Sequence, residues 1–97
     1  MTYKELQRAV AVLGLGERAT LAEVRRRHRE LVKRYHPDSP GGGDEGRIRE
    51  INDAHRLVQR YLAEYRFSFC EEEFYEQNPD ERLRQQFMTD PLWGGGE

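Results

Sequence analysis

Three stretches of this 97-residue chain carry apolar residues along one face of a potential helix and polar residues on the other. They run over residues 3–13, 21–35 and 45–65, and their apolar positions recur every three or four residues. A one-faced helix needs another surface to cover its apolar stripe. No stretch shows the alternation of a strand, and no segment is repeated. The chain is therefore predicted to be all-α, with these three helices packed against one another.

Local signals mark where the first two helices begin and end. Thr2 with Glu5, and Thr20 with Glu23, have the spacing of capping boxes. In such a box two side chains satisfy the first free backbone N–H groups of a helix. Gly14 provides a C-terminal stop for the first helix.

A rigid polar corner follows the second helix. The tripeptide His36-Pro37-Asp38 stands directly before a glycine-rich loop, residues 39–43, after which Asp44 can cap the third helix. Proline fixes its own φ and disfavours helical dihedrals in the preceding residue, so the helix must end here. Taken alone, the tripeptide is also a common helix-ending turn, in which Asp38 accepts backbone hydrogen bonds. In this setting a stiff polar corner is better suited to contact with a partner than to packing in a core.

The second helix also carries a face of a single charge sign. Four cations are predicted to lie opposite its apolar stripe: Arg25, Arg26, Arg29 and Lys33. Three of them are spaced four residues apart, where like charges repel by roughly 0.2–0.5 kcal/mol per pair. Runs of charge are usually only solvated faces. A stripe of charges that repel one another is easier to explain when an acidic surface binds it. We therefore predict that these four cations dock on an acidic partner.

Composition limits the core and indicates the compartment. Apolar residues make up 36% of the chain and charged residues 35%, so the core must be thin. The single cysteine, Cys70, leaves no internal disulfide and fits a reducing compartment, and we assign it only a packing role. No run approaches the ~18 apolar residues of a membrane span, and the first residues do not resemble a signal peptide. We predict a cytoplasmic protein with no membrane partner.

The formal net charge of −2 hides an asymmetry along the chain. Residues 1–60 contain 13 Lys and Arg against 9 Asp and Glu, whereas residues 61–97 contain 3 against 9. The two parts therefore carry +4 and −6. The positive charge of residues 1–60 predicts an acidic partner. The negative charge of residues 61–97 is able to shield that positive charge.

Residues 66–97 are predicted to form a short helical extension. A capping box of Ser68 and Glu71 predicts one short helix, and a last helix is expected between Asn78 and Asp90. The extension is rich in large apolar side chains: Phe67, Phe69, Phe74, Tyr75, Phe87, Leu92 and Trp93. We expect these side chains to pack back onto the three helices and enlarge the core. The alternative is that they bind a client or another partner.

In their order and spacing along the chain, these features resemble the J-domain of DnaJ-type co-chaperones. Residues 12–15 resemble the end of that family's first helix, and residues 22–35 resemble its second helix, which the signature His-Pro-Asp follows. Residues 48–55 resemble its third helix. The resemblance implies an antiparallel helical hairpin with the first helix packed across it. It also implies a J-domain over residues 1–65 and an extension over residues 66–97.

The resemblance further implies a function. Members of this family dock on a DnaK-type chaperone and stimulate its ATP hydrolysis, using the signature corner and the basic second helix. The predicted partner-binding residues of this chain are His36, Pro37, Asp38, Arg25, Arg26, Arg29 and Lys33. Because no chemistry occurs on a J-domain itself, we expect no enzyme activity, no catalytic residue, no cofactor and no metal.

The chain departs from the family's usual pattern at several positions. The family has an aromatic residue where this chain has His28, and often a second one at His55. It often has a basic residue at the position of Glu30, and a basic residue followed by Asn in place of Ser39 and Pro40. These departures bear on which chaperone the chain prefers.

Other functions were weighed against this one. A J-like scaffold would bind a partner without stimulating an ATPase. A nucleic-acid-binding module would lay the Arg-rich helix on phosphates, but the net acidity of the chain counts against it. His28 and His36 would lie about 12 Å apart along a helix, too far to share one metal ion. His36 and Asp38 have no nearby nucleophile in the sequence for acid–base catalysis.

Overall fold

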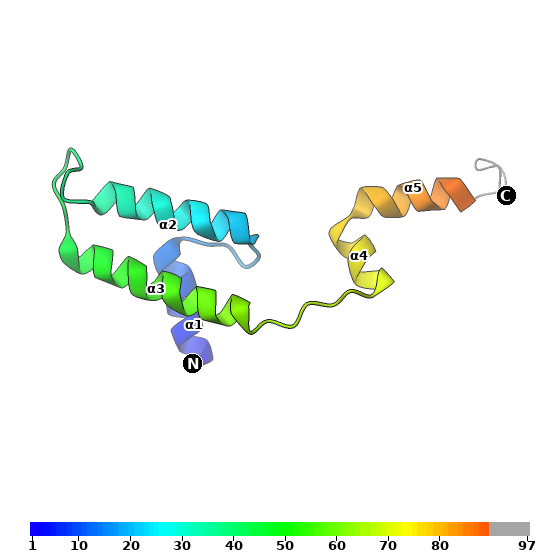
Figure 1. Ribbon diagram of the computed structural model, residues 1–97, viewed down its shortest axis with the longest axis horizontal. Helices are drawn as coiled ribbons and strands as arrows, with labels where there is room; N and C mark the ends of the chain where they lie inside the picture. Colours follow the sequence, from blue (N-terminus) through cyan, green and yellow to red (C-terminus); the bar gives the residue numbers. More distant parts are fainter. Residues whose placement is uncertain (90–97) are drawn as a thin grey trace. The chain divides into compact units, whose positions relative to one another are not determined.

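The computed structural model of the chain describes residues 1–89. These residues contain five helices, joined by loops, and no strand (Figure 1). The helices are α1 (Tyr3–Leu13), α2 (Leu21–Tyr35), α3 (Glu45–Ala63), α4 (Glu71–Gln77) and α5 (Pro79–Thr89). The prediction of an all-α chain is confirmed. The expected helix stop at Asp90, and the predicted packing of Leu92 and Trp93, lie outside the described residues.

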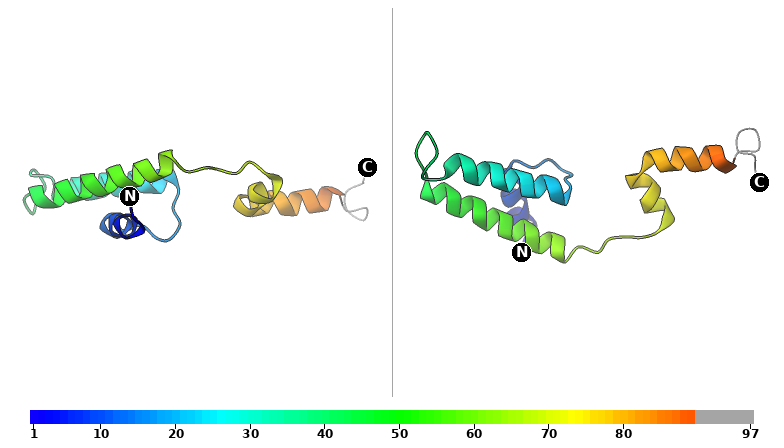
Figure 2. Two further views of the ribbon diagram at one scale, coloured as in Figure 1. Left: turned by 90° about the horizontal axis from the view of Figure 1, so that it is seen from below. Right: turned by 45° about the horizontal axis from the view of Figure 1, so that its top comes forward.

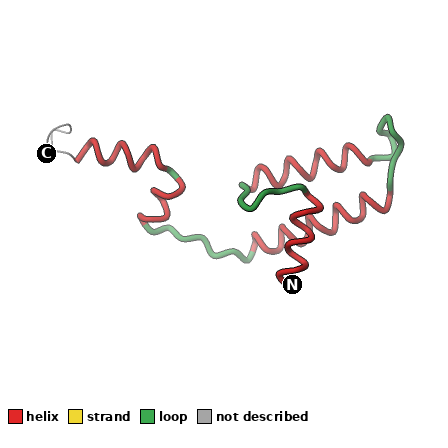
Figure 3. The backbone as a smooth tube through the Cα atoms, turned by 180° about the vertical axis from the view of Figure 1, so that it is seen from behind, coloured by secondary structure: helices red, strands yellow, loops and turns green. Residues whose placement is uncertain are grey.

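The chain divides after Tyr65 into two units. In the first unit, α2 and α3 run antiparallel and side by side, joined by the loop of residues 36–44 (Figure 2 and Figure 3). α1 lies across one face of this hairpin and packs chiefly against α3. In the second unit, α4 and α5 contact each other. The first unit thus has the hairpin arrangement that the sequence implied.

The two capping boxes of the first unit form as predicted. At the start of α1, the N–H of Glu5 donates to Thr2 Oγ1 (3.1 Å) and the N–H of Thr2 donates to Glu5 Oε1 (2.6 Å). Thr20 and Glu23 make the same pair of bonds at the start of α2. In both boxes the backbone hydrogen bond to the glutamate lowers the pKa of its carboxyl group. These bonds set the register in which each apolar stripe faces the core.

The end of α1 is held by a residue of α2. Gly14 ends the helix in the left-handed region (φ 66°), which glycine adopts at no steric cost. Nε of Arg27 donates to the carbonyl of Leu13 (3.0 Å), and Nη1 of Arg27 pairs with Glu30 (2.9 Å). One arginine therefore satisfies a free carbonyl of α1 and fixes how α1 meets α2.

The core is thin and comes from α1, α2 and α3. Its buried members are Ala9, Leu13, Val24, Leu31, Ile51, Ala54 and Val58. Leu13 (0% exposed) and Ile51 (1%) are the most completely covered. Leu21 and Tyr61 share the helical spacing of the stripes but are exposed. Leu21 is the first residue of α2, and Tyr61 lies in the last turn of α3.

The start of α4 differs from the prediction. Ser68 does not cap this helix; the cap position is Cys70, which makes no side-chain capping bond. The hydroxyl of Ser68 instead donates to Cys70 Sγ (3.2 Å) and accepts from the N–H of Cys70 (3.3 Å). This local pairing occupies the serine, so the helix begins at Glu71. The packing role assigned to Cys70 is also wrong, because its side chain is exposed.

His28 and His55 stack between α2 and α3. Their ring centroids are 3.7 Å apart and the ring planes differ by 5°. Nε2 of His28 lies 2.9 Å from the Asn52 side-chain oxygen, whereas Nε2 of His55 is buried without a partner among the described residues. Burial, together with the neighbouring His28, lowers the pKa of His55. Both rings are half-buried, which fits their positions at the contact between α2 and α3.

This stack predicts that the hairpin weakens in mild acid. The unfolded chain protonates His55 near pH 6.5, and the folded chain does so only at lower pH. The unfolded state therefore binds more protons over that interval. The stabilising contribution is complete above about pH 6.5 and is lost as the pH falls through the folded pKa. We expect the urea midpoint to drop between pH 7.5 and pH 5.5.

Matched histidine variants test this assignment. The double variant His28→Phe/His55→Phe keeps two stacked rings without a titrating group, so its urea midpoint should depend less on pH over this range. His36→Gln removes the remaining histidine, which is exposed, and should keep the wild-type dependence. An equal pH dependence in the wild type and the double variant would show that the stack is not responsible.

Candidate partner-docking site

The His36-Pro37-Asp38 corner lies at the point where α2 ends. His36 is the C-cap of α2 and has extended dihedrals (φ −65°, ψ 144°). This is the conformation that a following proline favours. The N–H of Ser39 donates to the carbonyl of His36 (2.9 Å) and closes a turn around the corner. The predicted break in the helix is therefore present, and a hydrogen bond holds the turn.

The corner displays a donor and an acceptor to solvent. The N–H of Asp38 donates to Nδ1 of His36 (3.1 Å), so the neutral ring carries its proton on Nε2. The side chains of His36 and Asp38 are 54% and 92% exposed. Nδ1 and the nearer Asp38 oxygen are 3.7 Å apart, and they form an ion pair only when the ring is protonated. A partner would therefore meet a free carboxylate beside an imidazole of fixed tautomer.

The four predicted cations of α2 lie exposed on its surface. None of Arg25, Arg26, Arg29 and Lys33 forms an ion pair with another residue of the range 1–89. Arg27, on the same helix, instead points toward α1 and pairs with Glu30. The structure thus places the four predicted cations outward, and it separates them from Arg27, about which the sequence analysis made no prediction. In addition to the hydrogen bonds of the capping box, the charge of Arg26 helps to lower the pKa of Glu23, whereas no ion pair within residues 1–89 neutralises Arg25, Arg29 or Lys33.

A shallow hollow joins the corner to part of the basic face. Its lining residues are His28, Arg29, Val32, Lys33, His36, Asp38, Ser39 and Pro40. The structure therefore brings Arg29, Lys33, His36 and Asp38 together around one concavity. Arg25, Arg26 and Pro37 lie outside its lining. His28, one of the two half-buried rings of the histidine stack, forms part of the wall.

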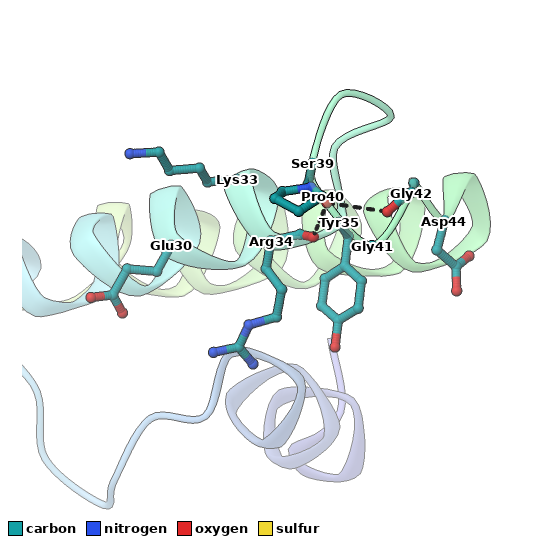
Figure 4. A pocket seen from close by; sticks show the side chains of 10 residues that line it. Glu30, Lys33, Arg34, Tyr35, Ser39, Pro40, Gly41, Gly42 and Asp44 are labelled. Atoms are coloured by element: carbon teal, nitrogen blue, oxygen red, sulfur yellow. Dashed lines mark hydrogen bonds between the residues drawn. The ribbon is translucent and has the colours of Figure 1, made fainter.

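A second hollow lies beside the first, between the last turn of α2 and the glycine-rich loop (Figure 4). Lys33, Ser39 and Pro40 line both hollows. The hydroxyl of Ser39 lies within hydrogen-bond distance of the carbonyls of Arg34 (2.9 Å) and Gly42 (3.1 Å), as the dashed lines show. The loop is thus tied back to the helix whose end carries the corner.

Sequence reasoning missed two kinds of residue at this site. Arg34 is basic, exposed and on the wall of the second hollow, and its charge was a usable signal. Ser39 and Gly43 contact the corner only through the folded loop. Gly43 follows the C-cap His36 by seven residues, beyond the reach of the rule for a glycine that ends a helix, so only the tertiary structure identifies these contacts.

Residues 1–89 contain neither a candidate metal site nor a candidate membrane span. Within that range no group of three or more His, Cys, Asp and Glu side chains is placed to hold a metal ion. No helix there combines the length and the apolarity needed to cross a bilayer.

Comparison with known proteins places the first unit in a family. The family model described as the DnaJ domain matches residues 3–61. A Sinorhizobium sp protein named "Uncharacterized 19.0 kDa protein in cobS 5'region" is 40% identical over 55 residues, which is 55% of this chain and 32% of that protein. The chaperone protein DnaJ of Caldicellulosiruptor saccharolyticus is 39% identical over 49 residues, covering 48% of this chain and 13% of that protein.

A eukaryotic relative matches over a stretch of the same length. The DnaJ-related protein spj1 of Schizosaccharomyces pombe is 37% identical over 49 residues, covering 48% of this chain and 13% of that protein. The chain thus spans about a third of the first relative's length and far less of the DnaJ chaperones. No solved structure gave a significant match. The family model covers more than half of the chain, and on that ground the protein belongs to the DnaJ-domain family.

Proposed function

We propose that this protein is a co-chaperone that docks on a DnaK-type ATPase chaperone and stimulates its ATP hydrolysis. The observation that carries the proposal is the exposed His36-Pro37-Asp38 corner, which shares a hollow with the unneutralised cations Arg29 and Lys33. Membership of the DnaJ-domain family supports the same reading. In this proposal the chain does no chemistry of its own.

Two parts of the site have different roles in the proposal. The cations of α2 attract an acidic surface of the chaperone and speed the encounter. The rigid corner then binds two conformations of the chaperone with different affinity. It binds the ATP-hydrolysing conformation more tightly than the resting conformation. A ligand shifts a conformational equilibrium only by such a difference in affinity. Docking and stimulation are therefore separable by substitution.

Charge reversal on α2 should weaken docking. We expect Arg25→Glu/Arg29→Glu to slow association with a DnaK-type chaperone on the order of tenfold at low salt. The wild-type rate should also fall as salt rises, because the Debye length shrinks to about 8 Å at physiological ionic strength. Surface plasmon resonance at several salt concentrations measures both effects.

A matched control separates the local effect from net charge. Arg82→Glu/Arg84→Glu changes the net charge by the same amount but alters α5 and leaves α2 intact. It should leave the association rate close to that of the wild type. If both double variants bind alike, or if salt has no effect on the wild type, the cations of α2 form only a solvated face.

Two simpler functions are outcomes of the same experiments. Binding without a change in ATP turnover would assign the chain to a J-like scaffold. Salt-sensitive binding to random-sequence duplex DNA, without chaperone binding, would favour a nucleic-acid-binding module.

We also propose an organisation and a location for the chain. The family match to residues 3–61 and the structural division after Tyr65 support a J-domain over residues 1–65 followed by an extension over 66–97. The aromatic side chains of the extension would enlarge the core or receive a client. We place the protein in the cytoplasm, where the exposed thiol of Cys70 would stay reduced.

A further inference from the structure

One glycine of the loop lies directly against the corner. A Cβ atom built on Gly43 would come within 2.5 Å of Pro37 Cα and 2.7 Å of Pro37 N. Real Cβ atoms essentially never approach other atoms this closely, and the atoms met here are backbone atoms. A side chain at position 43 would therefore displace the loop or the His36-Pro37 peptide.

The contact at Gly43 differs from those of its neighbours. A Cβ on Gly41 would meet nothing within 4 Å, and Gly41 does not have a positive φ. Gly42 also faces open space, but its φ of 80° makes any substitution strained. Among these three loop glycines, only Gly43 is required because its backbone packs against the corner.

Hydrogen bonds hold the loop in this position. The N–H of Asp44 donates to the carbonyl of Tyr35 (3.1 Å), directly behind the corner. The single proton of the Ser39 hydroxyl has two carbonyl oxygens within reach, those of Arg34 and Gly42, and the N–H of Gly42 donates to the carbonyl of Ser39 (2.8 Å). The corner is thus closed in from behind by a loop that is itself bonded to the last turn of α2.

We propose that Gly43 and Ser39 are positioning residues for the docking corner. The backbone of Gly43 supports the His36-Pro37 peptide from behind, and the hydroxyl of Ser39 keeps the loop in place. Together they fix the direction in which His36 and Asp38 face a partner. The activity part of this inference rests on the proposed stimulation of a DnaK-type chaperone, whereas its structural part does not.

The test compares Gly43→Ala with Gly41→Ala in the full chain. Gly43→Ala should lower the maximal stimulation of chaperone ATPase at least fivefold. Its affinity for the chaperone should stay within about twofold of the wild type, because the cations of α2 are untouched. Gly41→Ala should match the wild type in both measurements. Equal maximal stimulation by the two variants would overturn the proposal.

Amide hydrogen exchange tests the structural part without the chaperone. In Gly43→Ala the N–H of Asp44, which bonds to Tyr35, should exchange on the order of tenfold faster. The amide of Ile51 in the core should exchange at the wild-type rate. If Ile51 also exchanges faster, Gly43 supports the fold as a whole, and its role as a positioning residue is refuted. If Asp44 is unchanged, the predicted contact is absent.

Substitution of Ser39 provides a second route, in which the disruptive change, Ser39→Ala, adds no bulk to the loop at the corner. Ser39→Ala removes the hydroxyl and should lower maximal stimulation, whereas Ser39→Thr keeps the hydroxyl and should restore at least half of it. Equal maximal stimulation by Ser39→Ala and the wild type would refute the role of this side chain. If the wild type itself fails to stimulate, the proposed function fails, while hydrogen exchange still decides the positioning role.

Discussion

Replacing His36 by glutamine is expected to abolish the stimulation of ATP hydrolysis and to leave the fold intact. The imidazole is more than half exposed, and its side chain makes only local contacts with Asp38 among residues 1–89. Substitutions at surface positions of this kind usually change the free energy of unfolding by no more than about 0.5 kcal/mol. The loss should therefore appear in chaperone ATP turnover, measured with the variant at saturating concentration.

Two further measurements make this result specific. The thermal unfolding curve of His36→Gln should coincide with that of the wild type. Its association rate with the chaperone should remain sensitive to salt, because the cations of α2 are still present. A variant that folds normally and stimulates as well as the wild type would remove His36 from the site.

Shortening Leu13 to alanine should have the largest effect on stability. Leu13 is fully buried at the end of α1, where this helix packs against the hairpin. Such a substitution removes buried methyl groups and leaves a cavity, which costs about 2–5 kcal/mol. Small domains are stable by only about 5–15 kcal/mol, so a large share of the total would be lost. Urea unfolding followed by circular dichroism measures this loss.

An exposed leucine provides the control for this prediction. Leu83 on α5 is 54% exposed. Leu83→Ala should therefore change the free energy of unfolding by no more than about 0.5 kcal/mol. Equal losses in the two variants would mean that Leu13 does not carry the packing of α1.

Much of the helical architecture was readable from the sequence because it depends on local signals. The boxes at Thr2 and Thr20, the cap at Asp44 and the stop at Gly14 all form where the pattern placed them. Each of these signals acts within one or two turns of backbone. Ser68 shows the limit of the approach, because a nearby Cys70 competes for the same hydroxyl.

The site was readable only in part. The helical period put Arg25, Arg29 and Lys33 on an outward face, and Pro37 predicted the break that exposes the corner. The hollow that joins Arg29 to Asp38 depends on how the loop folds back, which local spacing does not encode. The stack of His28 on His55 likewise depends on the packing of α2 against α3.

Single-turnover hydrolysis of ATP by a purified DnaK-type chaperone, with increasing amounts of the full wild-type chain, measures directly whether this protein stimulates the chaperone. The assay isolates the hydrolysis step from nucleotide exchange. The account predicts that the hydrolysis rate rises with the concentration of the chain and reaches a plateau, which His36→Gln fails to raise above the rate of the chaperone alone. A rate that stays at the chaperone's own value, at concentrations of the wild-type chain that saturate binding, would contradict it.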